Sequence, residues 1–350
     1  MDKLRVGILG ATGIIGQRLI SMIESHPFLE VTSVASSGHK SGMTYGSAVR
    51  WLLPEPLNRK YSEMKLIDAG RVAELAKECD MVVSALPSDA AGLERDLAQF
   101  LPVVSKSSYN RMRSDVPLYV PGVNEDHLDL IPHQQRVNGY KGFVSCDANC
   151  SSTQLAISLK PLMDLEPQSI LVDTMQAVSG AGYPGIPSMD ILGNVVPFIQ
   201  DEEEKIMSET KKIMGALDRN NQSILPRSID LAARCSRISV QDGHTETVFL
   251  RFRRGVDISE VRKALEGQRN LNVKERTYSF PEKLIVFHSA VDRPQPRIDA
   301  WVSRGMSVSV GGLRESGGWV TFTTVSHNTI LGGAGGAICQ IEALVKRGII

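Results

Sequence analysis

The fold of the first half of the chain is decided by the stretch Leu4-Arg5-Val6-Gly7-Ile8-Leu9-Gly10-Ala11-Thr12-Gly13-Ile14-Ile15-Gly16. It runs from a short apolar strand into a turn whose glycines have the spacing GxxGxxG. A helical run through Leu19, Ile20 and Ile23 follows, and a second apolar strand is expected around residues 31–34. Strand, glycine turn, helix and strand within about 30 residues are typical of a dinucleotide-binding unit. A turn with only a structural role is the alternative.

The glycines of this turn suit a bound dinucleotide. Gly10 allows the tight turn, Gly13 lets the backbone approach a pyrophosphate, and Gly16 permits close packing of helix on strand. The pyrophosphate is expected at the N-terminus of the helix, where free N–H groups and the helix dipole favour anions. The expected cofactor contacts of the turn are Gly10, Ala11, Thr12, Gly13, Ile14 and Ile15.

The end of the second strand selects the cofactor. An acidic residue there would accept hydrogen bonds from the adenosine ribose and favour NAD. The chain has Ala35-Ser36-Ser37-Gly38-His39-Lys40-Ser41 instead. Hydroxyl groups and a lysine suit a 2′-phosphate, so we expect NADP. A solvated polar loop is the alternative, but it does not explain the missing acid. The expected contacts are Ser36, Ser37, Lys40 and Ser41.

Two more strands are expected at residues 81–86 and 102–105, with their carboxyl ends at the ligand-binding edge of a doubly wound sheet. The stretch Lys106 to Arg113 after the second of them is a short basic cluster. Arg111 or Arg113 could bind an anion there, and a surface arginine without a role is the alternative. The cofactor contacts expected at the end of the first strand are Ser84, Leu86 and Pro87.

The second half opens on Asp147-Ala148-Asn149-Cys150-Ser151-Ser152-Thr153. Apolar residues at helical spacing follow (Leu155, Leu159 and Leu162), so the cysteine precedes a helix. The helix dipole and free N–H groups lower the pKa of such a cysteine and favour the thiolate. A thiolate attacks electrophilic carbon and forms a thioester or a thiohemiacetal. A small buried hydrophobe is the alternative.

A strand at residues 169–175 leads to Gln176, which we expect at the reacting centre, and to the glycine-rich loop Ala177 to Gly185. Its glycines let the backbone come close to a ligand, and Ser179 and Gly180 are expected near the cofactor. Further on, Asp201-Glu202-Glu203-Glu204-Lys205 opens a helix with acids in its first turn. By composition alone this charge run indicates a solvated face.

Residues 236–240 and 245–252 read as two strands joined by Gln241-Asp242-Gly243. We therefore expect a β-hairpin that brings Arg237 and His244 to one side of a pocket. A histidine titrates near neutral pH and can serve a cysteine as acid or base, and a guanidinium binds a carboxylate through two hydrogen bonds. An exposed loop histidine without a role is the alternative.

The C-terminal stretch Ser326 to Gly336 is rich in glycine and enters a final helix that runs through Leu344. Its glycines indicate close packing against a nucleotide or another helix.

The composition excludes several classes. Lys and Arg together number 39, as do Asp and Glu, so among 350 residues the net charge is zero. This balance argues against a nucleic-acid or membrane partner, although a local basic pocket is allowed. No apolar run approaches the roughly 18 residues of a membrane span, and the N-terminus lacks the apolar stretch of a signal peptide. The five cysteines show no metal-type pairing, so we expect free thiols, no metal and a cytoplasmic protein.

Taken together, these motifs resemble the aspartate-β-semialdehyde dehydrogenases, in particular their archaeal and fungal branch, over nearly the whole chain. The long central motif and the Arg-x6-His spacing are specific. The matching motifs are GATGIIGQ (10–17), SALPSD (84–89), NCSST (149–153), MQAVSGAGYPGIPSMDIL (175–192), EEEK (202–205), CSRISVQDGHTE (235–246), DRPQPR (292–297) and HNTILGGAG (327–335).

The resemblance implies an α/β fold with two domains. An N-terminal NADP-binding Rossmann domain with a doubly wound sheet is expected at residues 1–149, completed by a C-terminal helix within 327–350. An α/β catalytic and dimerisation domain is expected at 150–326, with a mixed sheet that makes the interface of a homodimer or homotetramer.

The resemblance also implies the reaction. The expected activity is NADPH-dependent reduction of L-aspartyl 4-phosphate to L-aspartate 4-semialdehyde with release of phosphate, in the biosynthesis of lysine, threonine and methionine. Cys150 is expected to be the nucleophile, His244 the acid and base, and Gln176 the residue that orients the acyl-enzyme. Asn328 is expected to face the cofactor. The expected substrate contacts are Arg237 for the α-carboxylate, Glu203 for the α-ammonium group, and Arg111, Lys205 and Asn149 for the phosphate.

Two alternatives stay open at this point. The nearer one is an enzyme of the same fold with another acyl donor, such as malonyl-CoA reductase, although Asn149 favours a phosphate leaving group. The other is a non-catalytic NADP-binding paralogue with a regulatory role. A protein of that kind has no reason to keep Cys150, Gln176, Arg237 and His244 together.

Overall fold

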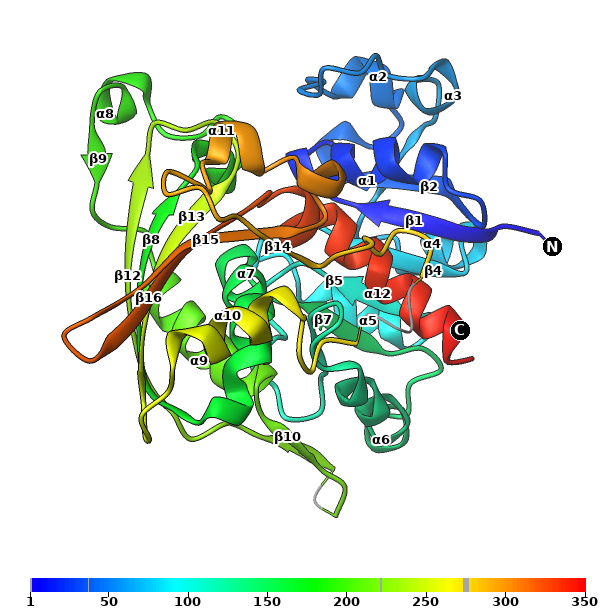
Figure 1. Ribbon diagram of the computed structural model, residues 1–350. Helices are drawn as coiled ribbons and strands as arrows, with labels where there is room; N and C mark the ends of the chain where they lie inside the picture. The colour runs from blue at the N-terminus through cyan, green and yellow to red at the C-terminus, as the bar shows by residue number, and fades with distance from the viewer. Residues whose placement is uncertain (1, 37, 221, 273–276) are drawn as a thin grey trace.

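The structure is a computed structural model in which residues 2–36, 38–220, 222–272 and 277–350 are described. Ser37, one of the expected cofactor contacts, lies outside the described residues. The described chain forms two seven-stranded sheets, a small two-stranded sheet and the helices that cover them (Figure 1). The α/β fold expected from the sequence is confirmed.

The first sheet is parallel throughout and has the strand order β3-β2-β1-β4-β5-β7-β6. Because this order reverses between β1 and β4, a crevice opens at the carboxyl ends of these two strands, and the glycine turn lies at its edge. The doubly wound sheet is therefore confirmed. Its strands are β1 (Leu4–Leu9), β2 (Leu29–Ser36), β3 (Leu66–Asp68), β4 (Met81–Ser84), β5 (Val103–Ser105), β6 (Leu118–Tyr119) and β7 (Val144–Asp147).

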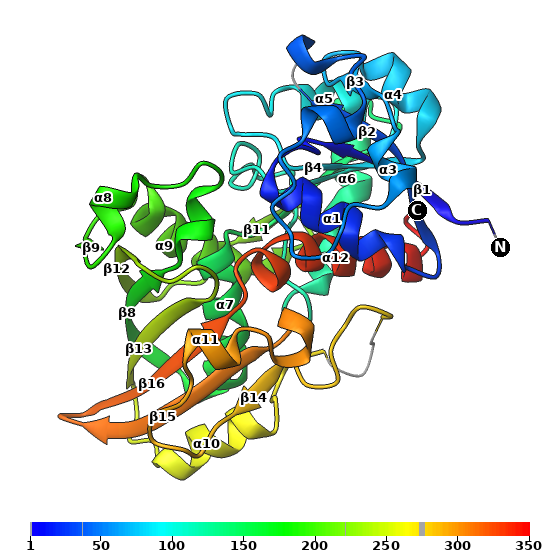
Figure 2. The ribbon, with the colours of Figure 1, turned by 90° about the horizontal axis from the view of Figure 1, so that it is seen from above.

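Helices cover both faces of this sheet. α1 and α12 contact each other on one face, and α4 and α5 contact each other on the opposite face (Figure 2). The C-terminal helix α12 thus returns to the first sheet, while the predicted domain boundaries stay predictions. The helices of this part are α1 (Ile14–Glu24), α2 (Tyr45–Ala48), α3 (Arg59–Ser62), α4 (Val72–Glu78), α5 (Leu93–Ala98), α6 (Ile131–Asn138) and α12 (Gly335–Lys346), with 3-10 turns η1 (Gly38–Lys40) and η2 (Glu125–Leu130) and the π-helical turn η6 (Ile330–Ala334).

The second sheet is mixed and has the order β14-β15-β16-β13-β8-β12-β9. Its strands are β8 (Pro167–Gln176), β9 (Val195–Val196), β12 (Asp230–Ile238), β13 (His244–Phe252), β14 (Ile285–Phe287), β15 (Val308–Ser316) and β16 (Trp319–Ser326); the small sheet pairs β10 (Ala216–Asp218) with β11 (Ser223–Leu225). The remaining helices are α7 (Cys150–Leu159), α8 (Ser188–Ile191), α9 (Glu202–Ile213), α10 (Ile258–Glu266) and α11 (Pro296–Asp299), with 3-10 turns η3 (Lys160–Leu165), η4 (Val178–Ala181) and η5 (Val302–Gly305).

The expected hairpin of β12 and β13 is wrong. β8 lies between the two strands, parallel to β12 and antiparallel to β13. The short connection at residues 239–243 therefore crosses the carboxyl end of β8. Two strands joined by a short turn predict a hairpin, because the local sequence does not show that a third strand lies between them. The crossing brings Gln176, Arg237 and His244 to one edge of the sheet.

Helix α7 lies between the two sheets (Figure 1), and every residue from Ser151 to Leu159 is buried. It contacts β13, β15 and β16 on one side and η6 on the other. Because α7 is enclosed by protein all round, its first residue is held rigidly. No helix among the described residues combines the length and apolar character needed to cross a bilayer.

Candidate active site

Cys150 is the first residue of α7, whereas the sequence analysis placed it just before the helix. Asn149 caps the helix, because its side-chain oxygen accepts hydrogen bonds from the N–H groups of Ser151 at 2.8 Å and Ser152 at 3.1 Å. Gly332 packs directly on the cysteine: a Cβ there would lie 2.6 Å from that of Cys150. One glycine of the C-terminal run thus allows close packing against α7.

The pKa of the Cys150 thiol is raised to about 12, opposite to the expected direction. Burial is the main cause and the carboxylate of Glu202 adds to it, whereas Arg237, Lys106 and Arg111 act against it. The helix N-terminus still favours a thiolate, but a buried charge loses its hydration, and here that loss is the larger effect. The sequence predicts that a helix starts near Cys150, but it does not show how far the thiol is buried.

His244 lies against the thiol, with 3.2 Å between Nε2 and Sγ. Its other ring nitrogen, Nδ1, accepts a hydrogen bond from the backbone N–H of Ala177 at 3.1 Å. In the neutral ring the proton is therefore on Nε2 and faces the sulfur. Burial, with a smaller effect of Arg237, lowers the pKa of His244 to about 3, so the ring is neutral at physiological pH. His244 is thus a hydrogen-bond donor to the reacting centre.

This lowered pKa predicts a pH dependence of stability. Between pH 6.5 and about 3, His244 is protonated in the unfolded chain but not in the folded chain. The free energy of unfolding is therefore unaffected by this group above pH 6.5 and decreases as the pH falls below it. The loss is about 1.4 kcal/mol for each pH unit. In chemical denaturation at pH 6.5, 5.5 and 4.5, we expect the wild type to lose more stability than His244→Gln by that amount. Parallel curves for the two proteins would contradict the prediction.

Gln176 and Arg237 are register partners at the ends of β8 and β12. Nη1 of Arg237 donates to the carbonyl of Ala177 at 2.9 Å, while its buried Nε has no partner among the described residues. The loop after β8 closes over these side chains at Gly180. A Cβ there would lie 2.8 Å from Nη1 of Arg237 and 3.0 Å from Cε1 of His244. A side chain at position 180 would push the guanidinium of Arg237 aside and press on the His244 ring, and the loop covers the Cys150–His244 pair.

The structure places Glu202, and not Glu203, in the site. The carboxylate of Glu202 is buried and accepts hydrogen bonds from the side-chain amides of Asn149 at 3.0 Å and Gln176 at 2.9 Å. Glu203 contacts Arg234 instead, at 3.2 Å. Successive residues of a helix point about 100° apart, so a run of three acids presents only one of them to the cysteine. Which one depends on how α9 packs.

The expected phosphate residues separate in the same way. Arg111 is buried and pairs with Glu209 at 2.9 Å, and Glu209 also accepts the backbone N–H of Asn149 at 2.7 Å. Arg111 and Asn149 are thus brought together beside Cys150. Lys205 is half-buried and has no side-chain partner in the described part of the chain. The buried lysine of α9 is Lys212, whose ammonium donates to three backbone carbonyls, including that of Arg111 at 2.7 Å.

Lys106 is a site residue that the sequence analysis did not single out from the basic cluster. It pairs with Asp147 at 3.0 Å and donates to the carbonyl of Gly332 at 3.2 Å, and both side chains are almost fully buried. Because Gly332 packs on Cys150, this ammonium holds positive charge close to the thiol. Its position directly after β5, at the ligand-binding edge of the sheet, is the signal that could have identified it.

The crevice between β1 and β4 fits a dinucleotide. Gly10 has φ +72°, and a Cβ there would lie 2.6 Å from the carbonyl oxygen of Ala85. At Gly16 a Cβ would lie 2.5 Å from the carbonyl oxygen of Gly10. Gly13 precedes α1 without a side-chain cap, so the N–H groups of the first turn are free to bind an anion. Ala11, Thr12, Ile14 and Ile15 complete this turn, and Ser84, Leu86 and Pro87 lie at the end of β4.

The other expected cofactor residues lie in two groups. Ser36 ends β2, Lys40 lies in η1 and Ser41 follows it, and Lys40 has no acidic partner among the described residues. On the catalytic side, Asn328 accepts the N–H of Gly243 at 3.0 Å and donates to the hydroxyl of Ser179 at 2.8 Å. These bonds connect three loops at the edge of the crevice: the loop before His244, the loop after Gln176 and the loop before η6.

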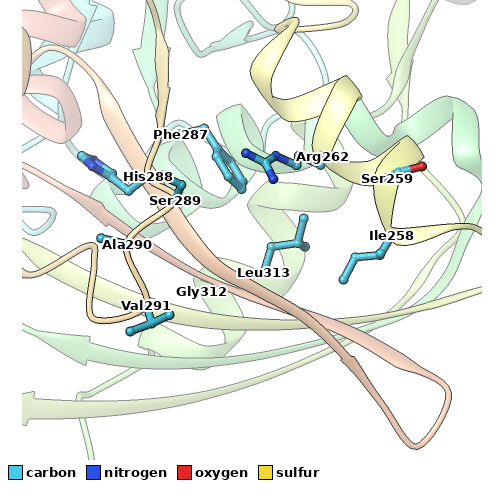
Figure 3. Close-up of a pocket in the computed structure, with 10 residues that line it drawn as sticks. All are labelled: Ile258, Ser259, Arg262, Phe287, His288, Ser289, Ala290, Val291, Gly312 and Leu313. Carbon is cyan, nitrogen blue, oxygen red and sulfur yellow. The ribbon is translucent and has the colours of Figure 1, made fainter.

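Two cavities are relevant here. One of about 360 Å³ opens between α1 and the loops that precede His244 and follow Gln176. The other, of about 320 Å³, lies between α10 and the strands β14 and β15 (Figure 3). It contains none of the expected site residues, and its lining includes Arg262, Phe287 and His288. No group of His, Cys, Asp and Glu in the described part of the chain is arranged to hold a metal ion.

Comparisons with known proteins place this geometry in context. Residues 5–131 match the family model "semialdehyde dehydrogenase, NAD binding domain", and residues 159–331 match "semialdehyde dehydrogenase, dimerisation domain". The aspartate-semialdehyde dehydrogenase of Methanothermobacter thermautotrophicus is 42% identical over 346 residues, which are 97% of this chain and 99% of that protein. That of Aspergillus fumigatus is 40% identical, over 99% of both chains.

A solved structure is similar throughout. The Candida albicans aspartate-semialdehyde dehydrogenase with NADP superposes with a TM-score of 0.90 and 34% identity, over 100% of both chains.

Proposed function

Because this chain belongs to the aspartate-semialdehyde dehydrogenases, alongside archaeal and fungal enzymes, we propose that it reduces L-aspartyl 4-phosphate to L-aspartate 4-semialdehyde and phosphate with NADPH. The observation that carries the proposal is the contact of the half-buried Cys150 with the buried His244, 3.2 Å between Sγ and Nε2, with Arg237 and Glu202 around the pair. These groups suit an acyl substrate that also has a carboxylate and an ammonium group.

In the first step, the sulfur of Cys150 bonds to the acyl carbon and the bond to phosphate breaks. The thiol proton leaves with the phosphate, so that acyl phosphate and thiol become thioester and hydrogen phosphate. Nε2–H of His244 donates to the negative charge that develops on sulfur and on the carbonyl oxygen. The position of Cys150 on a rigid helix fixes the attacking atom.

For the second step, the glycine turn and the first turn of α1 would hold NADPH, which would supply a hydride to the thioester carbon. Collapse of the resulting oxyanion expels the sulfur of Cys150 and frees the aldehyde. Nε2–H of His244 stabilises the departing thiolate until it regains a proton. The loop at Gly180 covers the pair and keeps water from hydrolysing the thioester.

Arg237 and Glu202 are proposed to bind the amino-acid end of the substrate. The unpartnered Nε of Arg237 is free to donate to the α-carboxylate. Glu202, and not Glu203, is proposed for the α-ammonium group, because its carboxylate is held beside Cys150 by Asn149 and Gln176. For the phosphate we propose Arg111, Asn149 and Lys106, since no hydrogen bond or ion pair in the described part of the chain joins Lys205 to these residues.

A matched pair of substitutions tests this assignment. Glu202→Gln removes the charge beside the cysteine and is expected to raise KM for the semialdehyde about 10- to 100-fold, because a charged hydrogen bond to the ammonium group is lost. Glu203→Gln, one residue along the same helix, is expected to stay within about threefold of the wild type. Steady-state kinetics of both proteins decide between the two carboxylates. A larger rise in KM for Glu203→Gln than for Glu202→Gln would assign the α-ammonium group to Glu203.

The activity is tested in the reverse direction. NADP reduction with L-aspartate 4-semialdehyde is measured with and without inorganic phosphate, and we expect turnover only with phosphate. Turnover without phosphate would contradict the acyl-phosphate mechanism. Absence of turnover, with oxidation of NADPH by malonyl-CoA, would identify a malonyl-CoA reductase of the same fold. Inactivity in both assays with NADP still bound would favour a non-catalytic paralogue.

We also propose that two copies of the chain pair through the second sheet. Helices cover one face of it, while the opposite face of its central strands presents Leu171, Arg234 and Phe249. Leu171 is 40% exposed and lies opposite Phe249 on the neighbouring strand. Exposed apolar side chains such as Leu171 on a sheet face, bordered by charged residues, are typical of an interaction surface, and this face lies within the segment that matches the dimerisation model.

Leu171→Glu is expected to produce monomers, because a charge would be buried at the centre of the interface. Val137→Glu is the matched control, since Val137 is 56% exposed on α6, away from this face. Size-exclusion chromatography with light scattering measures the mass of both proteins and also distinguishes a homodimer from a homotetramer. A wild-type mass for Leu171→Glu would rule out this face.

The cytoplasm is proposed as the compartment. All five cysteines are free thiols, which is expected where the cell keeps thiols reduced.

A further inference from the structure

Arg18 is a buried cation that the proposed reaction does not use. It lies in α1 and is only 8% exposed. In the described part of the chain it has no hydrogen bond and no ion pair, and its Nε is fully buried. Arg111 and Arg237, the other buried arginines among the described residues, both have hydrogen-bond partners. An unpaired buried guanidinium is costly, so its retention indicates a partner that binds there.

The guanidinium is held in place by an aromatic ring. It lies 5.5 Å from the ring centroid of Trp301, which in turn packs edge-on against His327. This contact orients the plane of the guanidinium but supplies no acceptor for its N–H groups. Trp301 therefore positions Arg18 and leaves its hydrogen-bonding capacity free.

Arg18 lines the cavity of about 360 Å³ between α1 and the catalytic loops, together with Ile14, Ser179, Gln241 and Asp242. Ile14 and Arg18 are one helical turn apart and share a face of α1. Helix side chains lean toward the N-terminus, so the guanidinium is directed toward the end of α1 that fits a diphosphate. Of the residues proposed to bind the substrate, none lines this cavity. Asp242 is its acidic neighbour and forms no ion pair with Arg18.

We propose that Arg18 binds the nicotinamide-side phosphate of NADP, while the free N–H groups of the first turn of α1 bind the adenosine-side phosphate. This inference rests on the proposed use of NADP and adds to it a residue that neither the glycine turn nor the loop after β2 indicates. It also explains why the cavity extends from α1 to Ser179 and Gln241, which adjoin the catalytic pair.

The test compares two ligands in the absence of any substrate. NADPH carries both halves of the cofactor, whereas adenosine 2′,5′-bisphosphate carries the 2′-phosphate and the adenosine-side phosphate only. For Arg18→Met, which keeps the packing of the side-chain stem on Trp301, we expect NADPH to bind about 10- to 100-fold more weakly. The bisphosphate is expected to bind within about twofold of the wild type. Titration by NADPH fluorescence and by calorimetry measures both affinities.

Two variants sharpen the result. Arg18→Lys keeps the charge but not the planar donor set, so its affinity for NADPH is expected to lie between those of Arg18→Met and the wild type. Its affinity for the bisphosphate is expected to stay within about twofold of the wild type. Arg262→Met is the matched control, because Arg262 also lies over an aromatic ring, 5.3 Å from the centroid of Phe287, but in α10. It is expected to bind both ligands as the wild type does.

Unchanged NADPH affinity in Arg18→Met would overturn the proposal, and so would an equal loss for both ligands, which would indicate a purely structural role. If the variant does not fold, a crystal structure of the wild type with NADP decides. The guanidinium must then lie within hydrogen-bond distance of the nicotinamide-side phosphate, and any other position overturns the inference. Because no substrate is present, the outcome does not depend on which acyl donor the enzyme uses.

Discussion

Cys150→Ala is expected to lower kcat by about 10⁴-fold or more in the phosphate-dependent oxidation of L-aspartate 4-semialdehyde. The reason is that the sulfur forms the covalent bond in the first step and leaves in the second, and Cys150 is the one nucleophile among the described residues with a hydrogen bond to Nε2 of His244. Affinity for NADPH is expected to stay within about threefold of the wild type, because the crevice at β1 and β4 is untouched. Initial rates and NADPH titrations measure the two effects separately.

The matched control is Cys146→Ala, the same substitution four residues upstream. Cys146 is fully buried, burial raises the pKa of its thiol as it does for Cys150, and no histidine among the described residues forms a hydrogen bond with it. We expect this variant to keep kcat within about threefold. A mass increase equal to the acyl group, found on the wild type after quenching and absent from Cys150→Ala, would identify the thioester directly. Comparable activity of Cys150→Ala and the wild type would remove Cys150 from the mechanism.

His244→Ala is the second large effect, with an expected fall in kcat of about 10³-fold. The structure also predicts how substitutions differ. Because Nδ1 accepts the N–H of Ala177, His244 presents a proton on Nε2 to the sulfur. A glutamine amide also presents an N–H there but cannot act as a base. His244→Gln is therefore expected to be about 10-fold or more faster than His244→Ala.

The pH profile adds an independent check. Since burial lowers the pKa of His244 to about 3, its protonation is not expected to reduce kcat/KM between pH 8 and pH 5.5. A descending limb near pH 6.5 that disappears in His244→Gln would contradict the donor role. Equal rates for the glutamine and alanine variants would contradict it as well and would favour proton transfer to a freely rotating imidazole.

The local patterns of the sequence were enough for the nucleotide-binding half. The sequence predicts a tight turn at Gly10 and close packing of helix on strand at Gly16. The positive φ of Gly10 and the close backbone contacts at Gly16 confirm both predictions. These conformations depend on residues close in the sequence, within one βαβ unit, so the spacing of the glycines is enough to predict them. The position of Cys150 at the start of α7 is predictable for the same reason.

Longer-range features were not accessible in this way. The hairpin of β12 and β13 was wrong because β8, which lies between them, is some 60 residues away in the chain. Glu202 differs from Glu203 only in the direction of its side chain, which the packing of α9 decides. The raised pKa of Cys150 depends on burial by segments far along the chain, among them those that carry His244 and Gly332.

The sequence by itself determined the doubly wound half and the family, and it nominated Cys150, Gln176, Arg237 and His244 as the reactive groups. These follow from short-range spacing and from motifs that a single chain displays. Only the tertiary structure decided which carboxylate faces the cysteine, which nitrogen of His244 carries the proton, and that Arg18 is buried without a hydrogen bond or ion pair to any described residue. Each of these depends on the direction of a side chain and on the loss of water around it, and both are set by segments distant in the sequence.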